Sequence, residues 1–379
     1  MEIINLHLYP STFKFESRIL KETSSIIKLN LASRIIILSA GEKGQLKDEV
    51  ITEQIKLHRI IPFLNIFSPS KISKALFYGE FYVRALFFGV RQKITVINCH
   101  SLMMLPVAVF LKRMKNAKLI YDPHELETER LGLHGLGQKI SKWVERNLIS
   151  ACDATIVVSE SILKWYSSSY QLKNIFLIRN APHYFHTRKS NILREKLGIP
   201  DKQLIFLYQG LINEGRSIEL YLNAFSKMEY HHLVIMGYGP LEQMVKDYAL
   251  KFSNIHFHPA VKPYEVLEYT QSADIGLSLI ENCCLSYYYS LPNKFFEYIM
   301  AEIPLVVSSF PDMANLVESH DIGWAVDVNV EELIGAIKSI TPGDLIVKKE
   351  KLRKVKSQFT WENEEIALIK IFDGLHLRK

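Results

Sequence analysis

The sequence predicts an α/β protein made of two doubly wound domains, each built on a mainly parallel sheet. Short apolar runs alternate with amphipathic helical patterns along the whole chain, which is typical of parallel α/β layers. The length of 379 residues exceeds what one ordinary hydrophobic core accommodates. A polar, basic segment separates two such series. We therefore expect a first domain at 1–183, a linker or hinge at 184–200 and a second domain at 201–358.

The elements of each half follow from these apolar runs and helical spacings. In the first half we expect strands at 2–8, 33–39, 94–99, 118–122, 154–159 and 176–179, with helices at 17–27 and 102–115. In the second half we expect strands at 204–208, 233–236, 255–257, 275–279 and 305–308. Helices are expected there at 216–227, 264–271, 331–340 and 361–376, with a further one opening near Pro292. Ligands of such sheets bind beyond the carboxyl ends of the strands.

Composition and charge exclude several classes of protein. The chain is 48% hydrophobic and 23% charged, as in a globular protein. No basic segment followed by an apolar run opens the chain, and the longest apolar run, 102–111, is too short for a membrane span, so we expect neither signal peptide nor membrane helix. The four cysteines have no CxxC or zinc spacing, so we expect reduced thiols in a cytosolic protein.

The stretch 290–310 combines a buried helical stripe with polar residues at its rim. Pro292 suits the first turn of a helix because its missing N–H would be unpaired there. The stripe consists of Phe296, Ile299, Met300 and Ile303. Asn293 and Glu297 lie four positions apart beside it and can face a cleft. Glu297 is therefore placed to bind a polar ligand; the alternative is a solvated flank.

A second polar site is expected at 210–216, between a strand and a helix. Gly210 allows a close backbone turn, and Arg216 opens the helix. A helix N-terminus and a guanidinium both bind phosphate oxygens, so this loop suits a diphosphate. The chain lacks GxGxxG after the first strand and GxxxxGK[ST] throughout, which counts against a nicotinamide enzyme and a P-loop NTPase.

The segment 121–129 follows a predicted strand and carries a histidine in a turn. His124 could hydrogen-bond a sugar hydroxyl or the reacting centre; alternatively, Asp122 and His124 only cap the next segment. Three glutamates alternate after it, but such spacing points them in different directions on a helix and no companion ligands are evident. We therefore expect no metal site.

Basic residues alternate with aromatic ones in two stretches of the first half. Lys71, Lys74, Arg84, Arg91 and Lys93 lie within or beside the aromatic-rich stretch 74–93. A second basic group follows the apolar run: Lys112, Arg113, Lys115 and Lys118. Such a helix can lie on an anionic membrane face, although an ordinary core-facing helix with solvated charges fits equally well.

Several motifs together resemble the retaining nucleotide-sugar glycosyltransferases of family 4. They are the G-x5-R loop at 210–216, IMGYGP at 235–240, IHFHPAV at 255–261, SADIGLSL at 272–279 and LPNKFFEYIMAEIPLVVSS at 291–309. In the first half DPHE, VSESI and IRNAP match in the same way. The resemblance implies the GT-B fold, with two Rossmann-like domains facing a cleft. It also implies a C-terminal helix, at 359–379, that packs back on the first domain.

The resemblance assigns roles to individual residues. Glu297 matches the glutamate that binds the donor ribose, Arg216 the basic residue that neutralises the diphosphate, and His124 the histidine that approaches the transferred sugar. Backbone groups around Val261 and Lys262 would flank the base.

The other residues expected to bind the donor are Gly210, Leu291, Asn293, Lys294 and Glu281. Tyr289 stands where the family has another glutamate, which Glu281 could replace. Leu211 stands where a second basic residue is usual, for which Lys294 could substitute. The usual Gly-Gly loop after the first strand is replaced by YPSTFKF.

The implied function is retaining, metal-independent transfer of a hexose from a nucleoside-diphosphate sugar, with no further cofactor. The acceptor would be a glycan or a lipid-linked glycan in bacterial surface polysaccharide synthesis. The enzyme would be cytoplasmic, in peripheral contact with the inner face of the plasma membrane, and would bind no nucleic acid. The alternatives are a nucleotide-sugar epimerase of the same fold and a non-catalytic subunit that uses the fold to bind a partner.

Overall fold

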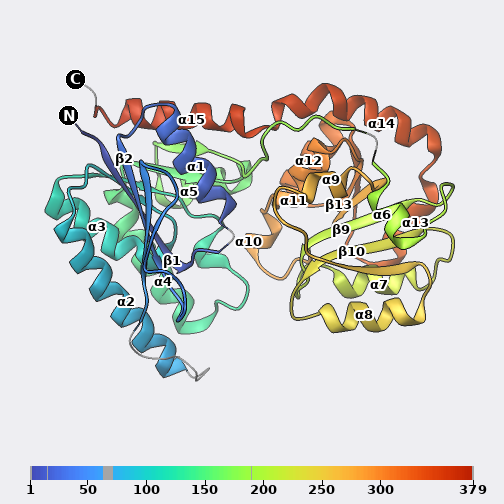
Figure 1. Ribbon diagram of the computed structural model, residues 1–379, viewed down its shortest axis with the longest axis horizontal. Coiled ribbons are helices and arrows are strands. Elements are labelled where there is room, and N and C mark those ends of the chain that lie inside the picture. The colour runs from blue at the N-terminus through green and yellow to red at the C-terminus, as the bar shows by residue number, and fades with distance from the viewer. Residues whose placement is uncertain (1, 15, 63–70, 189, 378–379) are drawn as a thin grey trace. The chain divides into compact units, whose positions relative to one another are not determined.

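The chain folds into two compact units, each with its own sheet (Figure 1). The computed structural model describes residues 2–14, 16–62, 71–188 and 190–377, with only the backbone of 71–75. The N-terminal unit comprises Met1–Ile178 and Glu365–Lys379, and the C-terminal unit comprises Arg179–Glu364. The two doubly wound domains predicted from the sequence are confirmed.

The N-terminal sheet has eight strands in the order β3-β4-β2-β1-β5-β6-β7-β8. The strands are β1 (Ile4–Thr12), β2 (Arg34–Ala40), β3 (Asp48–Val50), β4 (Ile55–Ile60), β5 (Val96–Cys99), β6 (Lys118–Tyr121), β7 (Ala154–Val157) and β8 (Ile175–Leu177). Neighbouring strands are parallel except β3, which runs antiparallel to β4. Strands β3 and β4, which form one edge of the sheet, were not predicted from the sequence.

The helices of the N-terminal unit connect these strands or cover the sheet. They are α1 (Ser17–Lys28), α2 (Lys71–Arg91), α3 (Leu105–Lys115), α4 (Gly135–Leu148) and α5 (Glu160–Tyr170). The predicted helix at 102–115 begins with a short 3-10 turn at Leu102–Met104. The last helix, α15 (Trp361–Gly374), places Glu365 against α1, where its carboxylate accepts hydrogen bonds from Ser25 at 2.7 Å and Lys28 at 2.8 Å. The C-terminal helix therefore packs on the first domain, as the resemblance implied (Figure 1).

The C-terminal sheet has six strands in the order β11-β10-β9-β12-β13-β14, and all its pairings are parallel. The strands are β9 (Ile205–Leu211), β10 (His232–Tyr238), β11 (Ile255–Pro259), β12 (Ile275–Ser278), β13 (Leu305–Ser308) and β14 (Gly323–Val326). The strand expected at 305–308 is β13, and β14, which was not expected, pairs along its outer side.

The C-terminal helices are α6 (Ile192–Leu197), α7 (Ile218–Phe225), α8 (Glu242–Lys251), α9 (Val266–Thr270), α10 (Leu285–Tyr288), α11 (Asn293–Met300), α12 (Pro311–His320), α13 (Val330–Ser339) and α14 (Pro342–Val355). Residues that alternate along the strands belong to two different buried clusters. One contains Leu207 and Val234, and the other contains Phe206 and Leu233. The segment expected as a linker, 184–200, lies within this unit and contains α6. Its Leu193 and Ile199 are buried in the hydrophobic core, which explains why the unit boundary falls at 178–179 instead.

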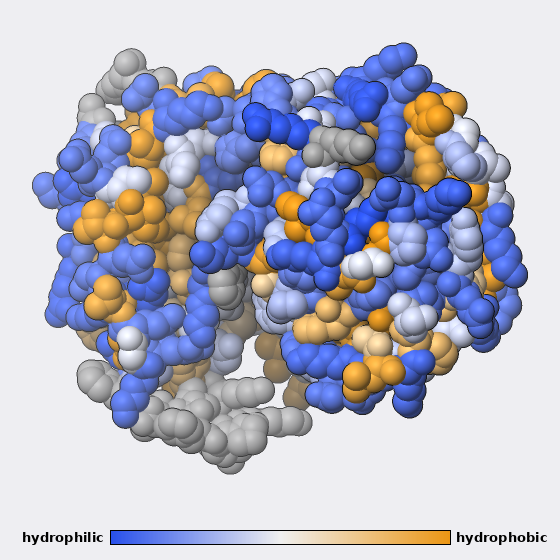
Figure 2. Space-filling model, turned by 45° about the vertical axis from the view of Figure 1, so that its right-hand side comes forward, coloured by the Kyte–Doolittle hydropathy of each residue, from blue (hydrophilic) through white to orange (hydrophobic). Residues whose placement is uncertain are grey.

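The surface is mixed in polarity. The face drawn in Figure 2 has hydrophobic patches set between hydrophilic side chains. Among the described residues, no helix is both long and apolar enough to cross a membrane. All four cysteines are free thiols.

Candidate active site

Two cationic side chains lie near the carboxyl end of β9 in the C-terminal unit. Arg216 precedes α7, and its guanidinium carbon is 4.6 Å from the centroid of the Tyr287 ring. Lys294, in the first turn of α11, has its Nζ atom 3.4 Å from the centroid of the Tyr208 ring. Tyr208 also interacts electrostatically with Arg216 and Tyr287, so the two cations and the two tyrosines form one group of side chains. The aromatic faces hold both cations in place without neutralising them.

Two glycines make room for this arrangement. Gly215 has a φ of 74°, and a Cβ atom there would lie 2.6 Å from the Tyr287 ring that supports Arg216. Gly210 has a φ of 118°, and a Cβ atom there would contact the Lys294 side chain at 3.7 Å. Both backbone conformations strongly favour glycine. Gly210, which was expected to form a close turn, lies within β9 and pairs with Gly237 of β10.

Among the residues that the structure describes, neither Arg216 nor Lys294 forms an ion pair. Burial lowers the pKa of Lys294 well below its usual range, the Arg216 charge lowers it further, and Glu297 opposes this shift. Two cations held close together without a partner disfavour each other, and a bound anion would relieve this repulsion.

Glu297 is half-buried on α11 and is held by a polar chain. Gln209 donates from Nε2 to the Glu297 carboxylate at 2.5 Å and accepts from the Thr270 hydroxyl at 2.8 Å. The other face of α11 is the buried stripe that the spacing predicted: Phe296, Ile299, Met300 and, beyond its end, Ile303. The rim position predicted for Glu297 agrees with this structure, whereas Gln209 and Thr270 were not anticipated.

Two of the other expected donor-binding residues are engaged in packing. Leu291 is 8% exposed and belongs to the hydrophobic core, and Val261 packs against the same core. Asn293 is exposed and accepts a hydrogen bond from the Asn180 amide at 2.9 Å.

Two further predicted contacts depend on loop backbone. The Lys262 amide donates to the Glu265 carboxylate at 3.1 Å, so this amide already has a partner in the absence of a base. Glu281 accepts from the Ser217 amide at 3.2 Å, which brings its carboxylate to the start of α7, one residue from Arg216. Glu281 therefore lies at the predicted phosphate loop, while the donor-sugar role expected of it stays a prediction.

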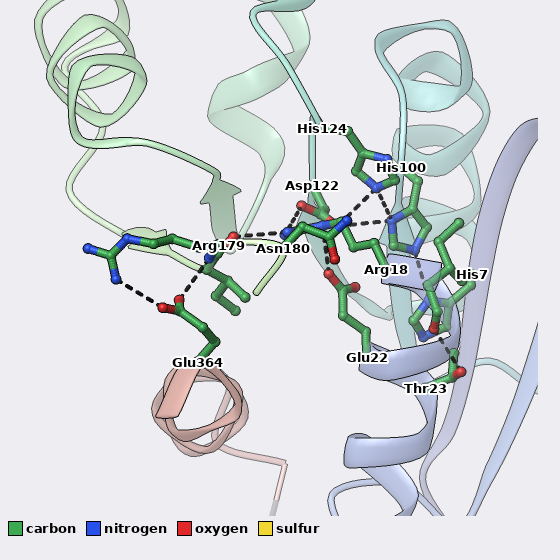
Figure 3. Close-up of polar contacts among 12 residues, drawn as sticks. His7, Arg18, Glu22, Thr23, His100, Asp122, His124, Arg179, Asn180 and Glu364 are labelled. Carbon is green, nitrogen blue, oxygen red and sulfur yellow. Dashed lines mark hydrogen bonds and ion pairs between the residues drawn. The ribbon is translucent and has the colours of Figure 1, made fainter. Parts of the chain in front are cut away.

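A buried ionic cluster occupies the N-terminal unit (Figure 3). Arg18 on α1 contacts the two oxygens of Asp122 at 2.9 and 3.3 Å and Glu22 at 3.0 Å. Its remaining nitrogen donates to the carbonyl of Ile178 at 2.9 Å. The Arg18 charge holds the pKa of Asp122 well below its usual range, against burial, which would raise it. Burial and the nearby Asp122 raise the pKa of Glu22, so Arg18 and Asp122 are the charged pair.

Three histidines extend from this cluster in a hydrogen-bonded series (Figure 3). His7 Nδ1 lies 2.8 Å from His100 Nε2, and His100 Nδ1 lies 3.0 Å from Asp122 Oδ2. Burial lowers the pKa of His7 well below its usual range and that of His100 to about 4, so both rings are neutral at neutral pH. An ionised carboxylate needs a donor, so His100 carries its proton on Nδ1 and accepts from His7 at Nε2.

This series has a consequence for the tautomer of His124. Its Nε2 atom lies 3.4 Å from Asp122 Oδ2 and 3.2 Å from His100 Nδ1. The carboxylate favours a proton on Nε2, so His100 and His124 both donate to Asp122 and not to each other, and Nδ1 of His124 is left as an acceptor. The ring is 26% exposed and lies beside the Tyr9 ring, with centroids 6.3 Å apart. It can therefore receive a hydrogen bond from a hydroxyl group.

Two groups in this cluster have spacings that could hold a metal ion. In the first, His100, Asp122 and His124 have ligand atoms within 4.8 Å of one another, and in the second His7, Glu22 and His100 do. Arg18 already neutralises the carboxylate of the first group, so a divalent cation would compete with the guanidinium at short range.

The sequence analysis singled out His124 but not its partners His7, His100 and Arg18, and it considered Asp122 only as a cap. A usable signal existed for two of these residues. His100 and Asp122 each directly follow a short apolar strand, and β5 and β6 are adjacent and parallel, so their carboxyl ends meet at one edge of the sheet. His124 belongs to the N-terminal unit, whereas Arg216, Lys294 and Glu297 belong to the C-terminal unit.

Two Rossmann-like units and a returning last helix define the GT-B class of glycosyltransferases. Residues 189–356 match the family model Glycosyl transferases group 1, and residues 30–181 match the model Glycosyltransferase Family 4. The chain thus belongs to the glycosyltransferases, with a family 4 domain followed by a group 1 domain, and the resemblance predicted from the sequence is confirmed.

Individual proteins agree with this assignment. A protein of Escherichia coli (strain K12), provisionally named as the colanic acid biosynthesis glycosyl transferase WcaI, is 22% identical in an alignment of 328 residues that covers 79% of each chain. The structure of sucrose-phosphate synthase from Thermosynechococcus elongatus has a TM-score of 0.80 at 14% identity over 99% of each chain. That of Anabaena Alr3699/HepE in complex with UDP has a TM-score of 0.72 at 13% identity over 98% of this chain and 100% of that chain.

Proposed function

We propose that this glycosyltransferase is a retaining hexosyltransferase that binds a nucleoside-diphosphate sugar in its C-terminal unit. The observation that carries the proposal is the pair Arg216 and Lys294, two cations without a carboxylate partner among the described residues, at the carboxyl end of β9. A diphosphate supplies the missing negative charge. Glu297, oriented by Gln209, is suited to accept hydrogen bonds from ribose hydroxyls.

In the proposed reaction, the bond between the anomeric carbon and the diphosphate oxygen breaks, and a bond from the acceptor oxygen to that carbon forms on the same face. The acceptor's proton passes to the leaving phosphate oxygen, so no separate base is required. Positive charge develops on the sugar and negative charge on the diphosphate. Arg216, Lys294 and the first amides of α7 stabilise that negative charge. His124 accepts a hydrogen bond from a hydroxyl of the transferred sugar through Nδ1.

The donor site can be tested by thermal unfolding with UDP, GDP, CDP and TDP. Anabaena Alr3699/HepE is described in complex with UDP and with UDP-glucose, which makes UDP the first nucleotide to try. We expect one nucleotide to raise the melting temperature in the parent protein and to do so much less in Arg216→Ala. The donor-site proposal fails if no nucleotide stabilises the parent at saturating concentration.

The proposed transfer needs no metal ion, because Arg216 and Lys294 provide the positive charge at the diphosphate. Sugar transfer should therefore proceed at the same rate after exhaustive treatment with a chelator and in buffer containing Mg²⁺. A rate that falls with the chelator and recovers with a divalent cation would assign part of this role to a metal.

The proposed acceptor is a glycan or lipid-linked glycan of bacterial surface polysaccharide synthesis, met by a cytoplasmic enzyme at the inner face of the plasma membrane. The provisional assignment of WcaI to colanic acid biosynthesis supports this setting. Transfer of radiolabelled sugar into a lipid extract rather than into soluble oligosaccharides would identify a lipid-linked acceptor.

A further inference from the structure

Helix α4 exposes its apolar side chains to solvent. Leu136, Ile140 and Trp143 are 73%, 53% and 68% exposed. Their spacings of four and three positions put them on one side of the helix. Glu145 is nine positions from Leu136, about two and a half turns, so it points to the opposite side. Helix α4 therefore exposes three large apolar side chains on one side and buries a carboxylate on the other.

The buried side of α4 is fixed by hydrogen bonds to Glu145. Its carboxylate accepts from Tyr121 of β6 at 2.9 Å, and from Tyr166 and Tyr170 of α5 at 2.8 and 2.7 Å. Three phenol donors to one fully buried carboxylate determine how the helix is rotated about its axis. The packing of α4 in the N-terminal unit therefore determines that the apolar stripe faces outward.

The apolar stripe has a basic border. Lys139, Lys142 and Arg146 are exposed on α4. Lys142 is paired with Glu129 at 2.6 Å, whereas Lys139 and Arg146 have no ion pair in the described part of the chain. The acidic side chains described on α2, α3 and α4 are not exposed as free charges, since Glu80 is paired with Arg84 and Glu145 is buried.

The neighbouring helices continue this surface. Helix α3 contacts both α2 and α4. Further exposed large hydrophobic side chains of these two helices are Leu76, Val83 and Phe87 of α2 and Phe110 and Met114 of α3. Arg91 and Arg113 are exposed among them. The side chains of Lys71 and Lys74, which the sequence analysis included, lie outside the described residues.

We propose that the apolar stripe of α4, with its neighbours on α2 and α3, docks on an anionic lipid surface. Apolar residues that point outward beside charges of one sign match a bilayer interface, which offers hydrocarbon next to anionic headgroups. A tryptophan in such a stripe suits the boundary between these two layers. The proposal deepens the proposed function, since the same surface would bring the enzyme to a lipid-linked acceptor. It also extends the sequence-based prediction, which did not include α4.

The test is co-sedimentation of the full chain, without nucleotide, with phosphatidylglycerol vesicles and with phosphatidylcholine vesicles. We expect binding to the anionic vesicles that weakens as salt is raised. Leu136→Ser combined with Trp143→Ser should weaken this binding roughly tenfold or more. Lys139→Glu combined with Arg146→Glu should weaken it similarly, with the loss concentrated at low salt. Leu250→Ser on α8, which removes a side chain that is 87% exposed in the C-terminal unit, is the matched control and should bind as the parent does.

Two results would overturn the proposal. One is that the parent protein does not bind phosphatidylglycerol vesicles, or that both α4 double variants bind them as well as the parent does. The other is a dimer in vesicle-free solution that dissociates on Leu136→Ser with Trp143→Ser, which would assign the stripe to a second copy of the chain. Nucleotide-induced stabilisation, measured on the same samples, reports separately on the donor site and should be unchanged in every α4 variant.

Discussion

The N-terminal cluster around Asp122 and the C-terminal site around Arg216 differ in whether their charged groups are paired with groups of opposite charge. Arg18 lies within 3.3 Å of carboxylate oxygens of both Asp122 and Glu22, so the guanidinium is fully paired. Arg216 and Lys294 lie over tyrosine rings instead, and among the described residues no carboxylate pairs with them. The pKa values follow this difference, since Asp122 stays ionised while Lys294 loses its proton more readily than usual.

This difference indicates a positioning role for the N-terminal cluster and a binding role for the C-terminal site. A paired charge inside a protein is satisfied without a ligand, so the cluster's contribution is to hold His100 and His124 in one tautomer and orientation. An unpaired cationic pair is unfavourable until an anion arrives, so the C-terminal site is organised for a ligand that the protein itself does not supply. Each prediction below alters one side of this comparison.

The largest effect is expected from Arg216→Ala, which removes the cation nearest the first turn of α7. Because the guanidinium opposes charge that grows as the diphosphate leaves, kcat/KM for sugar transfer should fall by about 10² to 10³. Steady-state kinetics and nucleotide titration measure the loss. The exposed Lys251→Ala in the same unit serves as control and should change neither quantity. A loss of less than twofold in Arg216→Ala would show that this site is not where the leaving group is stabilised.

The buried histidines should make folding stability depend on pH. Burial lowers the pKa of His100 from 6.5 to about 4, so below pH 6.5 the unfolded chain takes up a proton that the folded chain does not. The free energy of unfolding should therefore fall as the pH drops through this window, by about 3 kcal/mol for this residue. His7, whose pKa is also lowered, acts in the same direction. Urea unfolding of the parent, of His100→Gln and of His134→Gln, an exposed histidine, measures the slope. An equal slope in the parent and His100→Gln would contradict the neutral assignment.

His124→Ala should affect transfer without affecting nucleotide binding. Removing one hydrogen-bond acceptor for a sugar hydroxyl should lower kcat/KM roughly tenfold. The midpoint of nucleotide titration should stay as in the parent, because the residue lies in the N-terminal unit and the cationic pair in the other. His124→Gln, which keeps an acceptor in reach, should recover part of the activity. If nucleotide affinity fell with the rate, His124 would instead be supporting the fold of the donor site.

Sequence patterns predicted the two α/β halves, the stripe on α11 and the loop at Arg216 because each depends on local spacing. They did not predict the polar chain from Thr270 through Gln209 to Glu297, whose members are 61 and 88 residues apart along the sequence. Contacts of this kind depend on which strand ends become neighbours, and no local periodicity records that.

The unit boundary and the exposed apolar stripe of α4 were missed for related reasons. Leu193 and Ile199 look like part of a polar linker, yet they are buried in the same hydrophobic core as residues of β9 and α11. In α4 the apolar residues have ordinary amphipathic spacing, so the sequence alone favours burial. Only the three tyrosines that bind Glu145 show which side is inside.

The smallest effect expected is a pH dependence of nucleotide affinity through Lys294. Its pKa is lowered by burial and by Arg216, and a bound diphosphate favours the protonated amine, so binding should take up a proton. Affinity for the nucleoside diphosphate should therefore fall as pH rises through the pKa that Lys294 has in the free protein. Isothermal titration in two buffers of different ionisation enthalpy measures both affinity and proton uptake. Lys294→Met should bind more weakly and lose the uptake, whereas Lys262→Met, on the exposed loop after β11, should keep it. Uptake that persists in Lys294→Met would move the titrating group elsewhere and leave Arg216 as the cation that matters.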